Sequence, residues 1–330
     1  MQKANLTADE FANELTKYRK VLVVSHYNPD PDAFGSSCGL ALGLRELGFT
    51  AALLNQDGPV ERLGFIPGAK EISSNIPTEE FDALLACDCG DEKRLGDTLR
   101  PVLLPRFTRV LNLDHHQSNN FFGTHNRVVA EASSTSELVF ELLNILGKRV
   151  GKNAITKDVA NALYAGISAD TGSFRYSSTG PSTFRAAGEL LTLGAEPGKI
   201  SQELYSNSSK SAVLVQAEAL SNLRFEFGGK VSVVTVSKSL LVKHNAQADD
   251  TEDLVERARD IAGVEISVFL REDDDFWKAS LRSKSEKYDV AAVAQKFGGG
   301  GHRAAAGLRF RGTGAELEKR ILAELKLLVT

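Results

Sequence analysis

The sequence predicts an α/β protein: a parallel sheet with helices on both faces in an N-terminal domain, followed by a smaller α/β C-terminal domain. Short, continuously apolar runs alternate with helical stretches in the first half, as is typical of strands buried on both faces of a parallel sheet. The chain has 330 residues, enough for two hydrophobic cores, and 42% of them are hydrophobic and 25% charged. This composition is ordinary for a globular protein and excludes collagen-like and disordered classes.

Local sequence signals place the elements of the first half. Strands are predicted at residues 21–24, 51–54, 83–86 and 109–113. Helices are predicted over residues 7–17, 33–47, 134–146 and 156–167. Two of these helices begin with a capping box, formed by Thr7 with Glu10 and by Ser134 with Glu137. The helix at 33–47 is rich in small residues, which suits close packing on a sheet, and Gly48 is its predicted end.

A polar helical stretch over residues 184–216 is the predicted connection between domains, because Gly194, Pro197 and Gly198 interrupt it. We therefore expect a first domain at residues 1–190, a linker at 191–216 and a second domain at 217–330. The second domain is predicted to contain strands near residues 223–227, 231–236, 263–270 and 276–282 and helices near 290–296 and 314–328.

Charge, cysteine content and hydropathy exclude several classes of protein. The chain has 39 Lys and Arg and 43 Asp and Glu, so its net charge is -4. Non-specific electrostatic binding of long nucleic acid is therefore not expected, although a local basic patch can bind a short anionic ligand. Three cysteines, an odd number, predict no disulfide framework and favour a reducing compartment. No apolar run approaches the roughly 18 residues that span a bilayer, and the N-terminus lacks a signal-peptide pattern, so a cytoplasmic protein is expected.

Histidine and aspartate side chains gather where the predicted strands and helices of the first half end. They are His26, Asp30 and Asp32 after residues 21–24, Asp88 after 83–86, Asp114, His115 and His116 after 109–113, and Asp170 after 156–167. Because the carboxyl ends of parallel strands lie along one edge of a sheet, we expect these four segments to converge. A capped loop would explain the first segment alone, but not all four together.

A convergence of this kind predicts bound metal. Carboxylates so concentrated cannot all stay ionised in one cleft without cations. Imidazole and carboxylate ligands without thiolate favour Mn²⁺, with Mg²⁺ or Co²⁺ as alternatives. Six or so ligands exceed what one ion with an open position takes, which predicts two divalent ions about 3.5–4 Å apart, bridged by one carboxylate and a water.

These residues resemble the motifs of the DHH phosphoesterase family. His26-x-x-x-Asp30-x-Asp32, Asp88, Asp114-His115-His116 and Asp170 look like its four motifs, and residues 297–307 (FGGGGHRAAAG) look like the signature of its associated C-terminal domain. The motifs occur in family order over nearly the whole chain, and the two-domain layout is similar to the NrnA-type subfamily. By this resemblance, residues 1–190 are the DHH catalytic domain and 217–330 the DHH-associated substrate-binding domain.

The resemblance also implies roles for individual residues. It implies one metal ion held by His26, Asp30 and Asp88 and a second held by Asp32, Asp88, His115 and Asp170. Asp88 would bridge the two ions, His116 would face the scissile phosphate, and Asp114 would orient the neighbouring imidazoles. A direct contact between Asp114 and metal stays open. The implied catalytic residues are therefore Asp88, Asp114 and His116.

The glycines at 298–301 have a physical interpretation of their own. Successive glycines let the backbone approach a ligand closely and turn N–H groups toward an anion, which indicates a ligand-binding segment. The alternative interpretation is a flexible linker. Arg282 and Ser283, at the end of a predicted strand, resemble a phosphate-contacting position, although an ordinary exposed arginine is an equal alternative. The expected substrate-binding residues are His116, Arg282, Ser283, Gly300, Gly301, His302 and Arg303.

The resemblance implies a metal-dependent phosphoesterase that hydrolyses short oligoribonucleotides to mononucleotides, removes the 3′-phosphate of 3′-phosphoadenosine 5′-phosphate, or does both. A cyclic dinucleotide phosphodiesterase is the alternative. An inorganic pyrophosphatase or a non-catalytic nucleotide sensor fits less well, because the glycine run replaces the basic motif of the former and every expected ligand position is filled. Expected partners are short RNA or small nucleotides, without long duplex nucleic acid or membrane, and a homodimer is expected only by analogy.

Overall fold

The computed structural model describes residues 4–285 and 287–329 and divides into two compact units, the first ending at Asn207 and the second beginning at Ser208. The division lies inside the stretch 191–216 that the sequence suggested as a linker. Much of that stretch is helical, since it contains α7 (Pro197–Tyr205) and the first part of α8 (Lys210–Ser221). Over the described residues, no helix is both long enough and apolar enough to cross a membrane.

The first unit is built on a five-stranded sheet in the order β2-β1-β3-β4-β5, with every pair parallel. The strands are β1 (Lys20–Val24), β2 (Thr50–Leu54), β3 (Ala83–Cys87), β4 (Val110–Asp114) and β5 (His125–Val128). All residues of β3 and β4 are buried, as expected of central strands covered on both faces. The predicted parallel sheet is confirmed.

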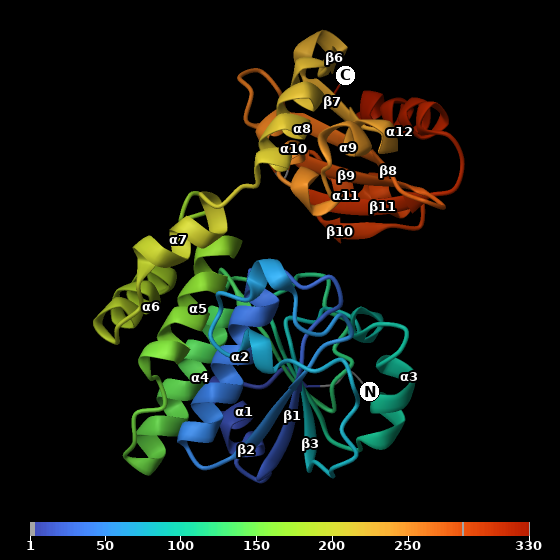
Figure 1. Ribbon diagram of the computed structural model, residues 1–330. Coiled ribbons are helices and arrows are strands. Elements are labelled where there is room, and N and C mark those ends of the chain that lie inside the picture. The colour runs from blue at the N-terminus through green and yellow to red at the C-terminus, as the bar shows by residue number, and fades with distance from the viewer. Residues whose placement is uncertain (1–3, 286, 330) are drawn as a thin grey trace. The chain divides into compact units, whose positions relative to one another are not determined.

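Helices cover both faces of this sheet. The helices of this unit are α1 (Ala8–Leu15), α2 (Pro31–Glu46), α3 (Arg100–Arg106), α4 (Thr135–Val150), α5 (Lys157–Asp170), α6 (Pro181–Thr192) and α7. Of these, α6 and α7 pack against α5. Figure 1 shows α2, α4 and α5 on one side of the strands and α3 on the other. Alternate residues of β1 belong to the two cores: Val21 and Val23 pack with α2, α4 and α5, whereas Leu22 and Val24 pack with α3.

Helices α2 and α5 approach each other closely because glycines stand at their contact. A Cβ atom added at Gly35 would lie 2.6 Å from the carbonyl oxygen of Ala162 and 3.0 Å from the backbone nitrogen of Gly166. At Gly39, an added Cβ would lie 2.5 Å from Cδ2 of Leu163. The prediction that these small residues pack closely on the sheet was wrong, because Gly35 and Gly39 face another helix, α5. This packing holds the start of α2 against the end of α5.

Gly35→Ala should therefore destabilise the protein. The clashing atoms at Gly35 are backbone atoms of α5, which cannot rotate away, and overpacking of this kind costs about 1–3 kcal/mol. We expect a fall in Tm of about 5 °C in a thermal scan of the full chain. Gly188→Ala in α6 is the matched control, because an added Cβ meets nothing within 4 Å there. The control should raise stability slightly, since alanine favours helix; equal Tm values for the two variants would contradict the packing argument.

The second unit contains a mixed six-stranded sheet in the order β10-β11-β9-β8-β7-β6, in which only β7 and β8 pair in parallel among the described residues. Its strands are β6 (Arg224–Glu226), β7 (Val231–Val236), β8 (Ile266–Glu272), β9 (Trp277–Ser283), β10 (Gly300–His302) and β11 (Ala305–Phe310). Its helices are α8, α9 (Lys238–His244), α10 (Leu254–Arg259), α11 (Val290–Gln295) and α12 (Gly314–Val329). Helices α11 and α12 contribute to one hydrophobic core of this unit, and α8 and α10 contribute to another. The predicted smaller α/β domain is confirmed.

Some elements were not anticipated from the sequence. Strands β5 and β11 and helices α3, α9 and α10 had no predicted counterpart. The glycine run that was expected as a ligand-binding loop contributes the short edge strand β10. Helix α1 ends at Leu15, two residues before the predicted limit.

Candidate metal centre

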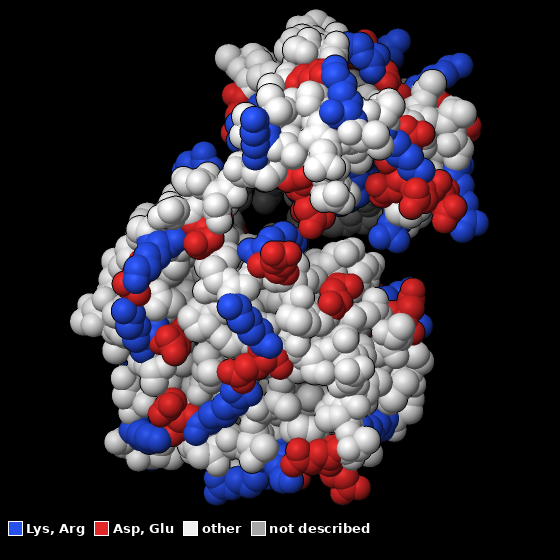
Figure 2. All heavy atoms as spheres, in the orientation of Figure 1, with Lys and Arg blue, Asp and Glu red and all other residues white. Residues whose placement is uncertain are grey.

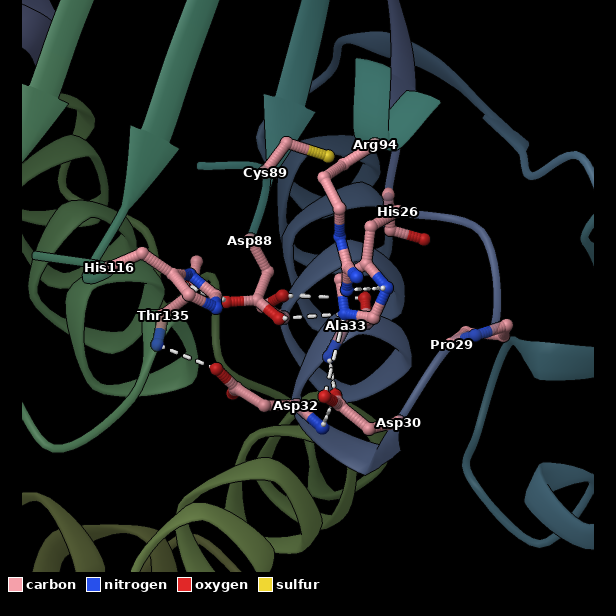
Figure 3. Close-up of polar contacts among 12 residues, drawn as sticks. His26, Pro29, Asp30, Asp32, Ala33, Asp88, Cys89, Arg94, His116 and Thr135 are labelled. Carbon is pink, nitrogen blue, oxygen red and sulfur yellow. Dashed lines mark hydrogen bonds and ion pairs between the residues drawn. The ribbon is translucent and has the colours of Figure 1, made fainter. Parts of the chain in front are cut away.

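The carboxyl ends of three neighbouring strands bring the predicted ligands together. Strands β1, β3 and β4 are adjacent in the sheet, and His26, Asp88 and His115 follow their ends. The first turn of α2 supplies Asp30 and Asp32, and the last residue of α5 is Asp170. Figure 3 shows His26, Asp30, Asp32, Asp88 and His116 pointing toward one another from these separate segments.

Three groups of side chains have ligand atoms within 4.8 Å of one another. The groups are His26 with Asp30 and Asp88; Asp32 with His115 and Asp170; and Asp88 with His115 and His116. Asp88 joins the groups through opposite oxygens: its Oδ2 lies 3.4 Å from Nε2 of His26, and its Oδ1 lies 3.6 Å from Nε2 of His115. These acidic and histidine side chains are positioned to bind metal.

The imidazole of His26 is a test of whether the site fits a cation. Its Nε2 atom is buried and has no hydrogen-bond partner among the residues that the structure describes, although Oδ2 of Asp30 lies 3.4 Å away. An unpartnered buried nitrogen is costly, and a metal ion would satisfy it. The other ring nitrogen, Nδ1, lies 2.8 Å from the carbonyl oxygen of Tyr27 and 3.0 Å from Arg94. Donation from Nδ1 to this carbonyl leaves the Nε2 lone pair for a metal, as in most histidine ligands.

Electrostatics of the cluster also fit a cation. Burial, together with the charges of Asp88 and Asp170, raises the pKa of Asp32 well above its usual range. Burial opposes protonation of His26, but the carboxylates of Asp30 and Asp88 outweigh it and raise the pKa of the ring to about 10. The cluster therefore attracts positive charge strongly, and divalent cations can take the place of the protons that it would otherwise hold.

The N-terminus of α4 holds two of the carboxylates. The backbone N–H groups of Thr135 and Ser136 donate to Oδ2 and Oδ1 of Asp32, at 2.7 and 3.0 Å. The hydroxyl of Thr135 donates to Oδ1 of Asp88 at 2.8 Å. Figure 3 shows Thr135 beside both aspartates. Sequence reasoning recognised the helix start at Ser134 but not this contact; the only signal was the run of hydroxyl residues at 133–136.

The backbone of Asp88 has an uncommon conformation. Its φ is 58°, in the left-handed region that non-glycine residues rarely adopt, with Asp and Asn the commonest exceptions. The N–H of Asp88 donates to the carbonyl oxygen of Leu113 at 3.0 Å, which ties this turn to the end of β4. Conformations of this kind cost of order 1–3 kcal/mol and occur where the surrounding structure holds them, commonly at functional sites.

Asp114 and His116 form a hydrogen-bonded pair beside the cluster. Oδ1 of Asp114 lies 2.8 Å from Nδ1 of His116, and Oδ2 accepts a 2.6 Å hydrogen bond from the side-chain amide of Asn119. Asp114 is fully buried and belongs to none of the three ligand groups found among the described residues. Asn119 was not singled out from the sequence.

The predicted substrate-binding residues of the second unit lie around β9 and β10. Gly301 has a φ of 145°, and an added Cβ would lie 2.3 Å from the carbonyl oxygen of Ala305 on β11, so this close strand pairing requires glycine. Gly300 lies in the same strand. The side chain of His302 lies outside the described residues, and Arg303 is about half exposed with Nε 3.7 Å from Asp289.

The side chains of Arg282 and Ser283 both form hydrogen bonds within the second unit. Nε of Arg282 donates to Oε1 of Glu256 at 2.8 Å, and the side chain is partly buried. Ser283 is buried, and its hydroxyl donates to the carbonyl oxygen of Ser285 at 2.8 Å.

His125 and His244 contact acidic residues outside the cluster, whereas Cys87 and Cys89 flank Asp88 in the chain. His125 is 3.5 Å from Glu14, and Nε2 of His244 is 2.7 Å from Glu218, in keeping with the absence of a motif around either. The cysteines are free and buried, and burial raises the pKa of the Cys87 and Cys89 thiols well above the usual value.

Comparison with known proteins agrees with this geometry. The DHH family N-terminal domain matches residues 20–167, and the DHHA1 domain matches residues 217–330. Over 319 residues the chain is 30% identical to the bifunctional oligoribonuclease and PAP phosphatase NrnA of Bacillus subtilis (strain 168), with 97% of each chain covered. The chain belongs to the DHH family. The family predicted from the sequence is thus confirmed.

Two further relatives extend the likeness. NrnA of Thermus thermophilus is 32% identical over 88% of this chain and 84% of its own. The crystal structure of an exopolyphosphatase-related protein from Bacteroides fragilis superposes with a TM-score of 0.88 at 30% identity, covering 98% of this chain and all of the other. Each of these relatives therefore matches both units of this DHH protein.

Proposed function

We propose that this DHH protein is a metal-dependent phosphoesterase that hydrolyses short oligoribonucleotides to mononucleotides and removes the 3′-phosphate of 3′-phosphoadenosine 5′-phosphate. The observation that carries the proposal is the pair of ligand groups joined through the two oxygens of Asp88. The end-to-end similarity to bifunctional oligoribonucleases and PAP phosphatases supports the choice of substrate.

The ligand groups suit two divalent ions, and their imidazole and carboxylate donors favour Mn²⁺, with Mg²⁺ or Co²⁺ as alternatives. His26, Asp30 and Asp88 would hold one ion, and Asp32, His115 and Asp170 the other. Asp88 would also contact the second ion, as the family resemblance implies, because its Oδ1 lies 3.6 Å from Nε2 of His115. When bound, such ions stabilise the charge of the phosphate and make water acidic enough to act as a nucleophile near neutral pH.

His116 supplies proton chemistry in this scheme. Its Nδ1 is held by the buried carboxylate of Asp114, which fixes the ring orientation and leaves Nε2 as the nitrogen that donates to the phosphate or to the departing ribose oxygen. Burial opposes protonation of His116, but Asp114 and Asp88 outweigh it and raise its pKa, so the ring is suited to act as a donor. Asn119, by binding the second oxygen of Asp114, keeps that carboxylate in place.

Substrate selection is assigned to the second unit. Gly300 and Gly301 would offer backbone N–H groups, and Arg282, His302 and Arg303 would offer side chains for a terminal phosphate or base. Ser283 is buried and its hydroxyl donates to Ser285, so it is less suited to this role. Figure 2 shows basic and acidic side chains interspersed over the face in view, which does not favour a long nucleic acid as substrate.

His302→Ala should raise KM for a dinucleotide about tenfold while changing KM for bis-p-nitrophenyl phosphate much less. The imidazole is assigned to the nucleotide's terminal phosphate or base, groups that the small diester lacks. Steady-state kinetics on both substrates measure this difference. Equal changes in KM would remove His302 from substrate recognition.

The function is tested by a substrate panel with the purified full chain. The panel contains oligoribonucleotides of 2 to 24 residues, 3′-phosphoadenosine 5′-phosphate, a cyclic dinucleotide and pyrophosphate, each with Mn²⁺, with Mg²⁺ and with EDTA. We expect metal-dependent turnover of the 2- to 5-mers and of 3′-phosphoadenosine 5′-phosphate, falling steeply toward the 24-mer. Turnover of pyrophosphate alone, an undiminished rate on the 24-mer, or no turnover at all would contradict the proposal.

A further inference from the structure

The chain makes an unusual turn directly after Asp170. Gly172, Ser173 and Phe174 have successive φ values of 55°, 60° and 63°, and consecutive left-handed residues are rare when two of them carry side chains. Hydrogen bonds hold the turn: the N–H of Ser173 donates to the carbonyl of Ser168 at 2.7 Å, and the N–H of Phe174 donates to the hydroxyl of Thr171 at 3.0 Å. The conformation is therefore built into the fold.

This turn places Phe174 between two other aromatic rings, stacked on Phe184 and tilted by 55° from Tyr164. Its centroid is 6.0 Å from that of Tyr164 on α5 and 5.5 Å from that of Phe184 on α6, with the two phenylalanine rings only 20° from parallel. The outer ring, Phe184, is 59% exposed, and Tyr176 and Tyr205 are also exposed. A stack whose last ring faces solvent can accept one more flat group.

Two arginines flank the exposed rings. Arg175 follows Phe174 and Arg185 follows Phe184, and both side chains are exposed. Nε of Arg175 donates to the carbonyl of Gly172 at 2.6 Å, but neither guanidinium forms an ion pair with any described residue. Exposed aromatic rings next to unneutralised arginines are the features that bind single-stranded nucleic acid, through base stacking and phosphate contacts.

This surface lies close to the metal centre within the same unit. Phe174 is four residues from Asp170, so their Cα atoms are at most about 14 Å apart. Phe184 contacts Phe174 and lies in the first turn of α6. The rings thus stand beside the ligands proposed for the second ion, within reach of a short chain of nucleotides.

We propose that Phe174, Arg175, Phe184 and Arg185, the aromatic–arginine surface, bind the bases and phosphates of a single-stranded oligoribonucleotide beyond the two nucleotides nearest the metal centre. The proposal rests on the proposed function and extends it, since it assigns the contacts that a trimer or longer substrate makes and a dinucleotide does not. Stacking on the outer face of Phe184 is tolerant of base identity, so little sequence preference is expected.

The test compares substrates of two lengths. For Phe184→Ala in the full chain, we expect the ratio of kcat/KM for a pentanucleotide to that for a dinucleotide to fall about tenfold. Phe184→Tyr should keep the ratio, because the ring is retained. Val150→Ala is the matched control: Val150 is 62% exposed, but it ends α4 roughly 22 Å from the start of that helix at Thr135. An unchanged ratio in Phe184→Ala, or an equal fall in Val150→Ala, overturns the proposal.

A binding measurement separates this proposal from the proposed function. The affinity of a fluorescein-labelled pentanucleotide, measured by anisotropy in EDTA, does not depend on turnover; we expect Kd to rise about tenfold in Phe184→Ala and in the double variant Arg175→Gln/Arg185→Gln. Failure of hydrolysis with this binding difference intact would reject only the function. If light scattering shows that Phe184→Ala splits a dimer while pentanucleotide affinity is unchanged, the surface is a contact between copies and the proposal is wrong.

Discussion

Asp88→Asn is expected to abolish hydrolysis while leaving the chain folded. The substitution removes the carboxylate charge that both Asp88-containing ligand groups share. We expect the transition state to lose several kcal/mol of stabilisation, so kcat/KM should fall roughly a thousandfold or more. Asparagine is the right replacement because it tolerates the left-handed conformation at φ 58°, whereas alanine would add backbone strain to the chemical loss. Turnover of a dinucleotide and of bis-p-nitrophenyl phosphate should fall together.

Two measurements make the Asp88→Asn result decisive. Far-UV circular dichroism of the metal-free protein should match the wild type, and calorimetric titration with Mn²⁺ should show loss of tight binding. Asp97→Asn is the matched control, since this aspartate is exposed and belongs to no ligand group among the described residues. Turnover within tenfold of wild type, with Mn²⁺ binding intact, would show that Asp88 does not bridge the ligand groups.

Thr135→Val is expected to weaken metal binding without unfolding the site. Valine keeps the shape of the side chain and the backbone N–H that donates to Asp32, but it removes the hydroxyl that donates to Asp88. Groups that hold metal ligands in place are commonly worth ten- to a hundredfold in affinity or activity, and we expect a loss of Mn²⁺ affinity in that range.

The conservative variant separates this positioning role from a packing effect. Thr135→Ser retains the hydroxyl and loses only a methyl group, so it should recover most of the Mn²⁺ affinity measured by calorimetry. If the role of Thr135 were purely structural, the Mn²⁺ affinity of Thr135→Val would stay close to that of the wild type. Thr135→Ser would then be the variant that loses stability in a thermal scan. That order would show that the hydrogen bond to Asp88 does not support the metal centre.

The core of the candidate site could be predicted from the amino-acid sequence because it follows from topology. A parallel sheet presents the carboxyl ends of its strands along one edge, so residues just beyond those ends must approach one another. His26, Asp88 and His115 obey that rule in adjacent strands. Their residue types then indicate metal, whatever the details of packing.

The unanticipated elements are those with weak local signals. Strand β5 has only four residues, two of them partly exposed and polar, so it shows neither a continuous apolar run nor a clear alternation. Strand β10 is Gly-Gly-His, a sequence with little intrinsic strand preference, and it exists through its pairing with β11. Pairing partners of this kind cannot be recognised from either segment alone.

The amino-acid pattern alone was enough to predict the two α/β units, the parallel sheet and the convergence of the histidine and aspartate side chains, because these depend on periodicity and on the edge where strands end. How the cluster is held depends instead on tertiary packing. The bonds from Thr135 to Asp32 and Asp88 join segments that are 103 and 47 residues apart. Contacts of such range require whole helices to pack against the sheet, which local sequence patterns do not encode.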